Sequence, residues 1–189
     1  MKRIFSIVLA LCFVLSLCAC GTGDSDIPET NNVIIVVEGY GEIHVTLTPE
    51  HAPITVKNFK MLVSKGAYDG TIFHRVVNNF VIQGGDTTLT SYGKADAIKG
   101  EFASNGVNNT LSHKRGVISM ARVGGMNNSA TSQFFIMHKD RTTLDGDYAA
   151  FGYVTEGMDV VDAIAAVPTN SWDDRPYVDV VVTTIKFAD

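Results

Sequence analysis

Cysteine is absent from most of this sequence. The three cysteines, Cys12, Cys18 and Cys20, all lie within the first twenty residues of a chain of 189. The rest of the chain therefore has no thiol that could form a disulfide framework or a cysteine-ligated zinc site.

Charged residues are also scarce, and the basic ones form no run. Only 19% of the residues are charged, the formal net charge is -5, and 46% of the residues are hydrophobic. Because Lys and Arg must neutralise phosphates in a nucleic-acid complex, this balance argues against nucleic acid as a partner. The hydrophobic content excludes a disordered polymer, and the length fits one domain.

One long hydrophobic run is present, and it lies at the N-terminus. Lys2 and Arg3 precede an uncharged, largely apolar stretch at residues 4–19. This is the pattern of a secretory signal peptide, and it is short for a membrane-spanning helix. The letters LCACG at residues 17–21 resemble the lipobox of bacterial lipoproteins. We therefore expect cleavage before Cys20, attachment of acyl chains such as palmitate to Cys20, and an extracytoplasmic protein anchored on the cell membrane.

The sequence divides into three segments on this interpretation. Residues 1–19 are the signal peptide, and residues 20–32 combine the lipidated cysteine with a small, polar, flexible tether. Residues 33–189 form the folded domain. An ordinary cleaved signal and an uncleaved anchor remain the alternatives for the N-terminal segment.

The folded domain is expected to contain short strands and two short helices. Pro53 suits the first turn of a helix whose apolar residues recur at helical spacing, and Gly66 can end that helix in a left-handed conformation. A second helix is expected at residues 158–167, before Pro168. Eight segments have the composition of strands: residues 33–38, 42–48, 71–77, 80–83, 116–121, 133–137, 150–154 and 178–187.

These elements predict a mainly β fold. Strands and helices do not alternate, which excludes a doubly wound parallel sheet. An antiparallel sheet that closes into an eight-stranded barrel would pair the last strand with an early one and remove exposed edges. Residues 87–115 have no strong periodicity, and such long irregular segments in compact domains are usually functional or disordered.

Polar and aromatic residues gather in three blocks: FHRVVNNFVIQGGD at 73–86, ISMAR at 118–122 followed by SQFFI at 132–136, and LDG with a following FG at 144–152. Strand alternation places Arg75 and Val77 on one face with Phe73. A fixed Arg75 and Gln83 beside several phenylalanines predict an apolar pocket with a few polar groups, the usual form of a small-ligand site.

The three blocks resemble the signature of the cyclophilin-type peptidyl-prolyl cis-trans isomerases. The likeness begins near residue 33, includes EIHVTLTPEHAPITVKNF at 42–59, and continues to the C-terminus. The resemblance implies a closed, eight-stranded antiparallel barrel capped by two helices. It also implies an enzyme that isomerises X–Pro peptide bonds without a metal or cofactor.

The resemblance assigns roles to nine residues. It implies that Arg75 is the catalytic arginine and that Gln83 contacts the substrate backbone. The expected substrate-binding residues are Phe80, Val81, Ala121, Arg122, Phe135, Leu144 and Tyr148. Of these, Ala121 and Arg122 match the segment that binds the residue before proline, largely through the main chain.

The expected chemistry suits these residue types. An X–Pro bond is held by amide resonance, with a barrier of about 18–20 kcal/mol. A rigid, permanently charged guanidinium such as that of Arg75 can donate to the prolyl nitrogen in the twisted state. The expected partners are proline-containing segments of unfolded or nascent secreted proteins and the membrane that holds the lipid anchor, and the protein is expected to act as a monomer.

The sequence departs from the family pattern around this pocket. Thr143 stands where many members carry tryptophan or another aromatic residue, which leaves cyclosporin sensitivity open, and Tyr148 and Arg122 replace the more usual His and Asn. The connection between Met120 and Gln133 is about two residues longer than in common forms. These departures motivate one alternative function, a non-catalytic module that binds or chaperones proline-containing segments.

Other chemistries have weaker support in the sequence. His74 beside Arg75 is a conceivable general base, but strand alternation points the two apart and favours a packing role. The remaining histidines, among them His113, are scattered without the spacing of metal ligands. Asp145 and Asp147 flank a glycine and are expected to form a turn.

Overall fold

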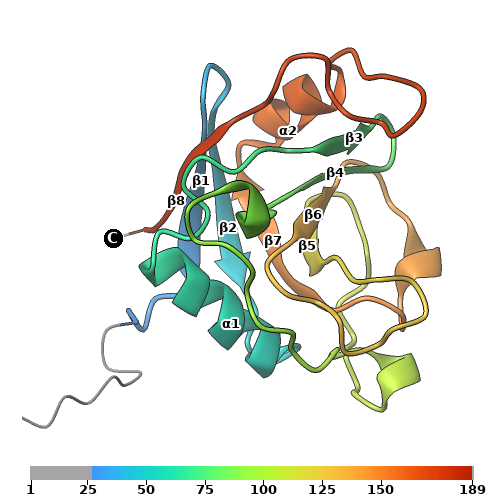
Figure 1. Ribbon diagram of the computed structural model, residues 1–189. Helices are drawn as coiled ribbons and strands as arrows, with labels where there is room; N and C mark the ends of the chain where they lie inside the picture. Colours follow the sequence, from blue (N-terminus) through green and yellow to red (C-terminus); the bar gives the residue numbers. More distant parts are fainter. Residues whose placement is uncertain (1–26, 189) are drawn as a thin grey trace, which may run out of the picture.

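The computed structural model describes residues 27–188 (Figure 1). The expected signal peptide, Cys20 and most of the expected tether lie outside these residues. Within the described part of the chain, no helix is long and apolar enough to cross a membrane.

In residues 27–188, eight antiparallel strands form one curled sheet, and two helices lie at opposite ends of it (Figure 1). The sheet order is β3-β4-β6-β5-β7-β2-β1-β8. The strands are β1 (Asn32–Val37), β2 (Gly41–Leu47), β3 (Arg75–Val77), β4 (Val81–Gly84), β5 (Val117–Met120), β6 (Phe134–Met137), β7 (Ala150–Glu156) and β8 (Val182–Phe187). The helices are α1 (Pro53–Ser64) and α2 (Met158–Ala165). The mainly β class and the two helices expected from the sequence are confirmed.

The expectation of a closed barrel is not met, because the hydrogen-bonded order is open, with β3 and β8 at its two ends. The two ends meet at an isolated bridge between Ile72 and Val181, and the N–H of Gly70 also donates to the carbonyl of Val182 (2.9 Å). Beyond that bridge, the backbone N–H of Val76 donates instead to the carbonyl of Asp174 (2.9 Å), so a loop takes the place of the ladder that would close the sheet. The strands expected at 71–77 and 178–187 are shorter than predicted for the same reason.

Helix α1 begins and ends as its sequence predicts. Pro53 is its first residue, and Gly66 follows its end at a φ of 62°. The backbone N–H groups of Ile54 and Thr55 donate to the carboxylate of Glu101, at 3.0 and 2.7 Å. Such N–H groups have no partner inside a helix, and a carboxylate is favourable at a helix N-terminus. The buried Glu101 thus ties the irregular segment 87–115 to the helix.

The interior of the curled sheet is filled by aromatic rings. The apolar face of α1 inserts Phe59, whose ring centroid lies 5.1 Å from that of Tyr68, 5.7 Å from Phe134 and 5.2 Å from Phe151. Phe73 also packs against Phe134, at 6.2 Å. We call this aromatic group and the aliphatic side chains around it the inner core. A second, smaller cluster lies outside it and includes Val81, Phe135 and Met137.

Candidate active site

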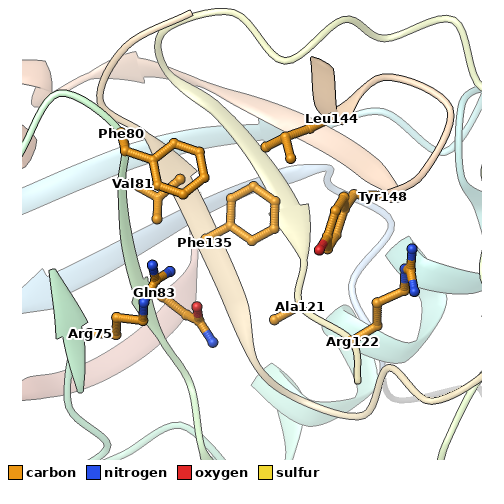
Figure 2. Close-up of a pocket in the computed structure, with 9 residues that line it drawn as sticks. All are labelled: Arg75, Phe80, Val81, Gln83, Ala121, Arg122, Phe135, Leu144 and Tyr148. Atoms are coloured by element: carbon orange, nitrogen blue, oxygen red, sulfur yellow. The ribbon is translucent and has the colours of Figure 1, made fainter. Parts of the chain in front are cut away.

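A surface pocket of about 270 Å³ opens over the second cluster (Figure 2). Nine residues line it: Arg75, Phe80, Val81, Gln83, Ala121, Arg122, Phe135, Leu144 and Tyr148. These are the nine residues that the sequence assigned to catalysis and substrate binding. The structure therefore brings the whole predicted set together, from segments as far apart as β3 and the loop before β7.

The register of three neighbouring strands explains the central part of the pocket. Arg75 on β3 pairs with Gln83 on β4, and Gln83 pairs in turn with Phe135 on β6. Because directly opposed residues on an antiparallel sheet share a face, these three side chains form a row across the strands. The guanidinium, the amide and the ring thus come from positions that the backbone ladder fixes.

Apolar side chains form the floor and one wall. Phe135 is only 5% exposed, and Val81 beside it is buried. Phe80 is presented by the β3–β4 turn, where Asn79 takes a φ of 60° that asparagine tolerates. The ring of Tyr148 meets that of Phe135 edge-on, with centroids 5.7 Å apart. Such a surface can hold a compact apolar ring such as that of proline.

The polar side chains of Gln83 and Arg75 are positioned by contacts with neighbouring side chains. The side-chain amide of Gln83 donates to Gln133 (3.1 Å), whose own amide donates to Asp86 (3.0 Å). A primary amide has two N–H groups and a carbonyl, so Gln83 keeps groups for a peptide backbone. The guanidinium of Arg75 lies over Phe80, with its Cζ 5.9 Å from the ring centroid, and its Nε is 3.4 Å from a carboxylate oxygen of Asp174.

Arg122 lies at the opposite rim of the pocket. Its Nε donates to the carbonyl of Asp147 (2.9 Å), and its Cζ lies 4.9 Å from the centroid of the Tyr148 ring. A guanidinium over an aromatic face is attractive. The Arg122 side chain therefore supports Tyr148, in addition to the main-chain role that the sequence suggested.

A polar network behind the pocket, in which His113 and Ser119 are buried and Asp145 is exposed, was not expected from the sequence. Nδ1 of His113 lies 2.8 Å from a carboxylate oxygen of Asp145, and Nε2 lies 3.0 Å from the hydroxyl of Ser119. A carboxylate only accepts, so Nδ1 carries the proton and Nε2 accepts from Ser119. The His113 ring stacks on Phe135, with centroids 6.0 Å apart. The order Ser-His-Asp is that of a hydrolase triad, but Ser119 is fully buried and cannot meet a substrate.

The surroundings of this network lower the pKa values of His113 and Asp145. Burial lowers the pKa of His113, although hydrogen bonding and charge from Asp145 oppose the shift. Burial alone would raise the pKa of Asp145, but hydrogen bonds from Ser112 and from His113 lower it. The neutral imidazole and the carboxylate are therefore the favoured forms. Only the three-dimensional fold brings them together, because 32 residues separate the pair in the sequence.

The comparisons with known proteins place this chain in a family. The family model of the cyclophilin type peptidyl-prolyl cis-trans isomerase/CLD matches residues 32–187. The chain belongs to the cyclophilin-type isomerases. It is 46% identical over 149 residues to a peptidyl-prolyl cis-trans isomerase of Acinetobacter baylyi, with 75% of this chain and 76% of the relative covered. It is 41% identical over 146 residues to the peptidyl-prolyl cis-trans isomerase-like 1 of Rhizopus delemar, and this match covers 77% of this chain and 86% of the relative.

Solved structures give the same family. A cyclophilin type peptidyl-prolyl cis-trans isomerase from Cryptosporidium parvum, determined in the presence of the dipeptide Ala-Pro, superposes with a TM-score of 0.74. Its sequence identity is 29%, and the match covers 84% of this chain and 99% of that one. The family activity is the cis-trans isomerisation of peptidyl-prolyl bonds. The resemblance seen in the three sequence blocks is thus confirmed.

Two other expectations for this cyclophilin-type isomerase can be compared with the structure. His74, the conceivable general base, is not among the residues that line the pocket, and burial is the main cause that lowers its pKa. Thr143 is exposed, beside the pocket residue Leu144. Between residues 27 and 188, no group of three or more His, Cys, Asp or Glu side chains could hold a metal ion.

Proposed function

We propose that the pocket isomerises X–Pro bonds by binding the twisted amide more tightly than the planar one, with no covalent step. The observation that carries this is the row of Arg75, Gln83 and Phe135 on three paired strands. It places a cationic donor and an amide beside an apolar floor. The proline ring would rest on that floor while the preceding carbonyl turns.

Each polar group has a task in this mechanism. In the twisted state the prolyl nitrogen regains a lone pair, and Arg75 donates to it. Gln83 holds the peptide backbone, so that only the carbonyl before proline moves. An acceleration of about 10⁵ requires roughly 7 kcal/mol of preferential binding to the twisted state. A few oriented donors in a partly dry pocket can supply an effect of that size.

The test is a protease-coupled assay with a proline peptide, applied to the purified protein. We expect Arg75→Ala to lower kcat/KM by about 10²- to 10³-fold, since loss of one oriented donor has that effect in other enzymes. Arg75→Lys keeps the charge but loses the planar guanidinium, so its activity should lie between those of wild type and Arg75→Ala. Equal activity of wild type and Arg75→Ala would remove the catalytic claim. Peptide binding without exchange between cis and trans NMR signals would instead favour the binding-module alternative.

We also propose where this isomerase works and on what. A lipidated Cys20 and the tether at residues 20–32 would hold the domain at residues 33–189 on the extracytoplasmic face of the membrane, as a monomer. There it would assist the folding of secreted or surface proteins. The basis is the sequence pattern at residues 17–21. Mass spectrometry of the mature N-terminus tests it: an acylated Cys20, lost together with membrane attachment in Cys20→Ser, is the expected result, and an unmodified N-terminus elsewhere would contradict it.

A further inference from the structure

The loop between α2 and β8 contacts the pocket residue Arg75 through Asp174. This loop, residues 166–181, runs beside β3 in Figure 1. A carboxylate oxygen of Asp174 lies 3.4 Å from Nε of Arg75, and the Asp174 carbonyl accepts a hydrogen bond from the N–H of Val76, the next residue on β3. Two contacts therefore join Asp174 to neighbouring residues of the strand that carries Arg75.

The loop itself determines where Asp174 lies. The side-chain oxygen of Asn170 accepts from the N–H groups of Trp172 (2.8 Å) and Asp173 (3.1 Å), and the N–H of Asn170 donates to the carbonyl of Arg175 (2.9 Å). Asp174 stands at the centre of this turn with a φ of 59°, in the left-handed region that aspartate and asparagine tolerate better than most residues. The carboxylate is thus presented to Arg75 from a fixed backbone.

The contact at Nε restricts Arg75 without occupying its outer donors. An arginine side chain has many rotamers, and ordering it costs entropy that a preformed contact can offset. Here Asp174 holds Nε and the Phe80 ring lies 5.9 Å from Cζ. Figure 2 shows the guanidinium directed between Val81 and Gln83, into the pocket. Its two terminal nitrogens therefore face the space where a prolyl peptide would bind.

We propose that Asp174 is a positioning residue for Arg75 in the isomerisation reaction. The proposal rests on the function proposed for Arg75, and Asp174 itself acts only through that side chain. The ion pair is about two-fifths exposed on both sides, at 37% and 41%. Exposed pairs contribute little to folding and are screened by salt. Loss of Asp174 should therefore change the order of Arg75, and with it the turnover rate, more than the stability of the fold.

Asp174→Asn is the sharpest test, because it keeps the size and the tolerance for positive φ while removing the charge. We expect kcat to fall about three- to fivefold with KM changed less than twofold. Asp179→Asn is the matched control, because Asp179 is an acid of the same loop that pairs with Arg175. It should leave both constants unchanged. If Asp174→Asn cannot be purified in folded form, Asp174→Gly, which also accepts the backbone conformation, replaces it.

Two further measurements separate positioning from a general structural effect. In an Arg75→Ala background, Asp174→Asn should have no additional effect, and rising salt should lower wild-type kcat toward that of Asp174→Asn. The Nε–H NMR signal of Arg75 should exchange with water faster in Asp174→Asn, whatever the activity. An unchanged Nε–H signal, or the same fold-loss in the Arg75→Ala background, would overturn the proposal. An Arg75→Ala variant as active as wild type, together with a changed Nε–H signal in Asp174→Asn, would instead refute the function proposed for Arg75.

Discussion

Phe134 and Phe135 are neighbours on β6, and they divide the molecule into two regions. Phe134 is fully buried in the inner core, where its ring meets those of Phe59, Tyr68 and Phe73. Phe135 points to the other face of the sheet and forms the floor of the pocket, between Tyr148 and His113. Adjacent residues of a strand face opposite sides. The same residue type therefore supports the fold at one position and a substrate surface at the next.

The difference lies in what surrounds each ring. Atoms enclose Phe134 on every side, to the extent that a Cβ added at Gly85 would lie 2.7 Å from it. Phe135 packs against Tyr148 and His113 and is only 5% exposed, but a pocket of about 270 Å³ lies over its remaining face. A ring in the first setting contributes mainly to stability. A ring in the second contributes mainly to binding, because its free face is kept for a ligand.

The largest expected effect comes from emptying the inner core. Phe134→Ala should lower the free energy of unfolding by about 3–5 kcal/mol, because the surrounding rings cannot collapse into the cavity. Chemical denaturation monitored by circular dichroism measures this loss. Phe134→Leu, which fills much of the space, should lose less. A loss of under about 1 kcal/mol in Phe134→Ala would mean that the ring is not a central support.

The matching change on the other face should act on catalysis. Phe135→Ala removes apolar contact with the proline ring, worth about 1.5–3 kcal/mol, so kcat/KM should fall by about 10- to 100-fold. Its cost in stability should be smaller than that of Phe134→Ala, because the vacated space opens to water. Phe135→Leu is the control that retains an apolar floor. Both alanine variants should be measured in the unfolding assay and in the isomerase assay. The division into two regions would be refuted if Phe134→Ala and Phe135→Ala lost stability and activity in the same proportion.

A smaller effect is expected from the network that supports the floor. Burial lowers the pKa of His113 in the folded protein, so the unfolded chain takes up this proton at a higher pH. The stability that the neutral His113 gives should therefore be lost as pH falls below about 6.5, with a slope of at most about 1.4 kcal/mol per pH unit. Denaturation at several pH values would measure the slope. His113→Gln should reduce it to the part due to His74, and an unchanged slope would contradict this account.

The smallest effect is expected from an aromatic residue that belongs to neither region. Trp172 is 95% exposed on the loop before β8. Trp172→Ala should change the free energy of unfolding by less than about 0.5 kcal/mol, because surface substitutions without buried contacts rarely do more. Thermal unfolding of Trp172→Ala and Phe134→Ala under the same conditions compares the two losses of stability directly. A larger loss would show that the loop relies on Trp172 and that exposure underestimates its role.

The sequence predicted the pocket better than it predicted what supports the pocket. All nine lining residues lie in or beside the three recognisable blocks, so the pattern alone could assign them. Asp174 and the contact of His113 with Asp145 could not be found in this way, because each partner lies on a loop whose path depends on the whole fold. Such contacts join segments that no local periodicity relates.

One local inference was wrong for a physical reason. Alternation along residues 71–77 placed Phe73 on the face of Arg75, but the chain enters the strand β3 only at Arg75. Phe73 belongs to the inner core together with Val76, three residues later, rather than to the pocket. The period of two applies only where the ladder exists. The open end of the sheet thus explains both the shorter strand and the misplaced ring.

The contact between Glu101 and helix α1 has a consequence for how the chain folds. Thr55 and Glu101 are separated by 46 residues, yet the carboxylate accepts two backbone N–H groups of the first helical turn and the hydroxyl of Thr55. The helix start is therefore incomplete until the irregular segment has docked, and closing so long a loop costs entropy. Docking of that segment and completion of the helix become one cooperative event. The amide protons of Ile54 and Thr55 should consequently report, by their protection from solvent exchange, on a segment that has almost no regular structure of its own.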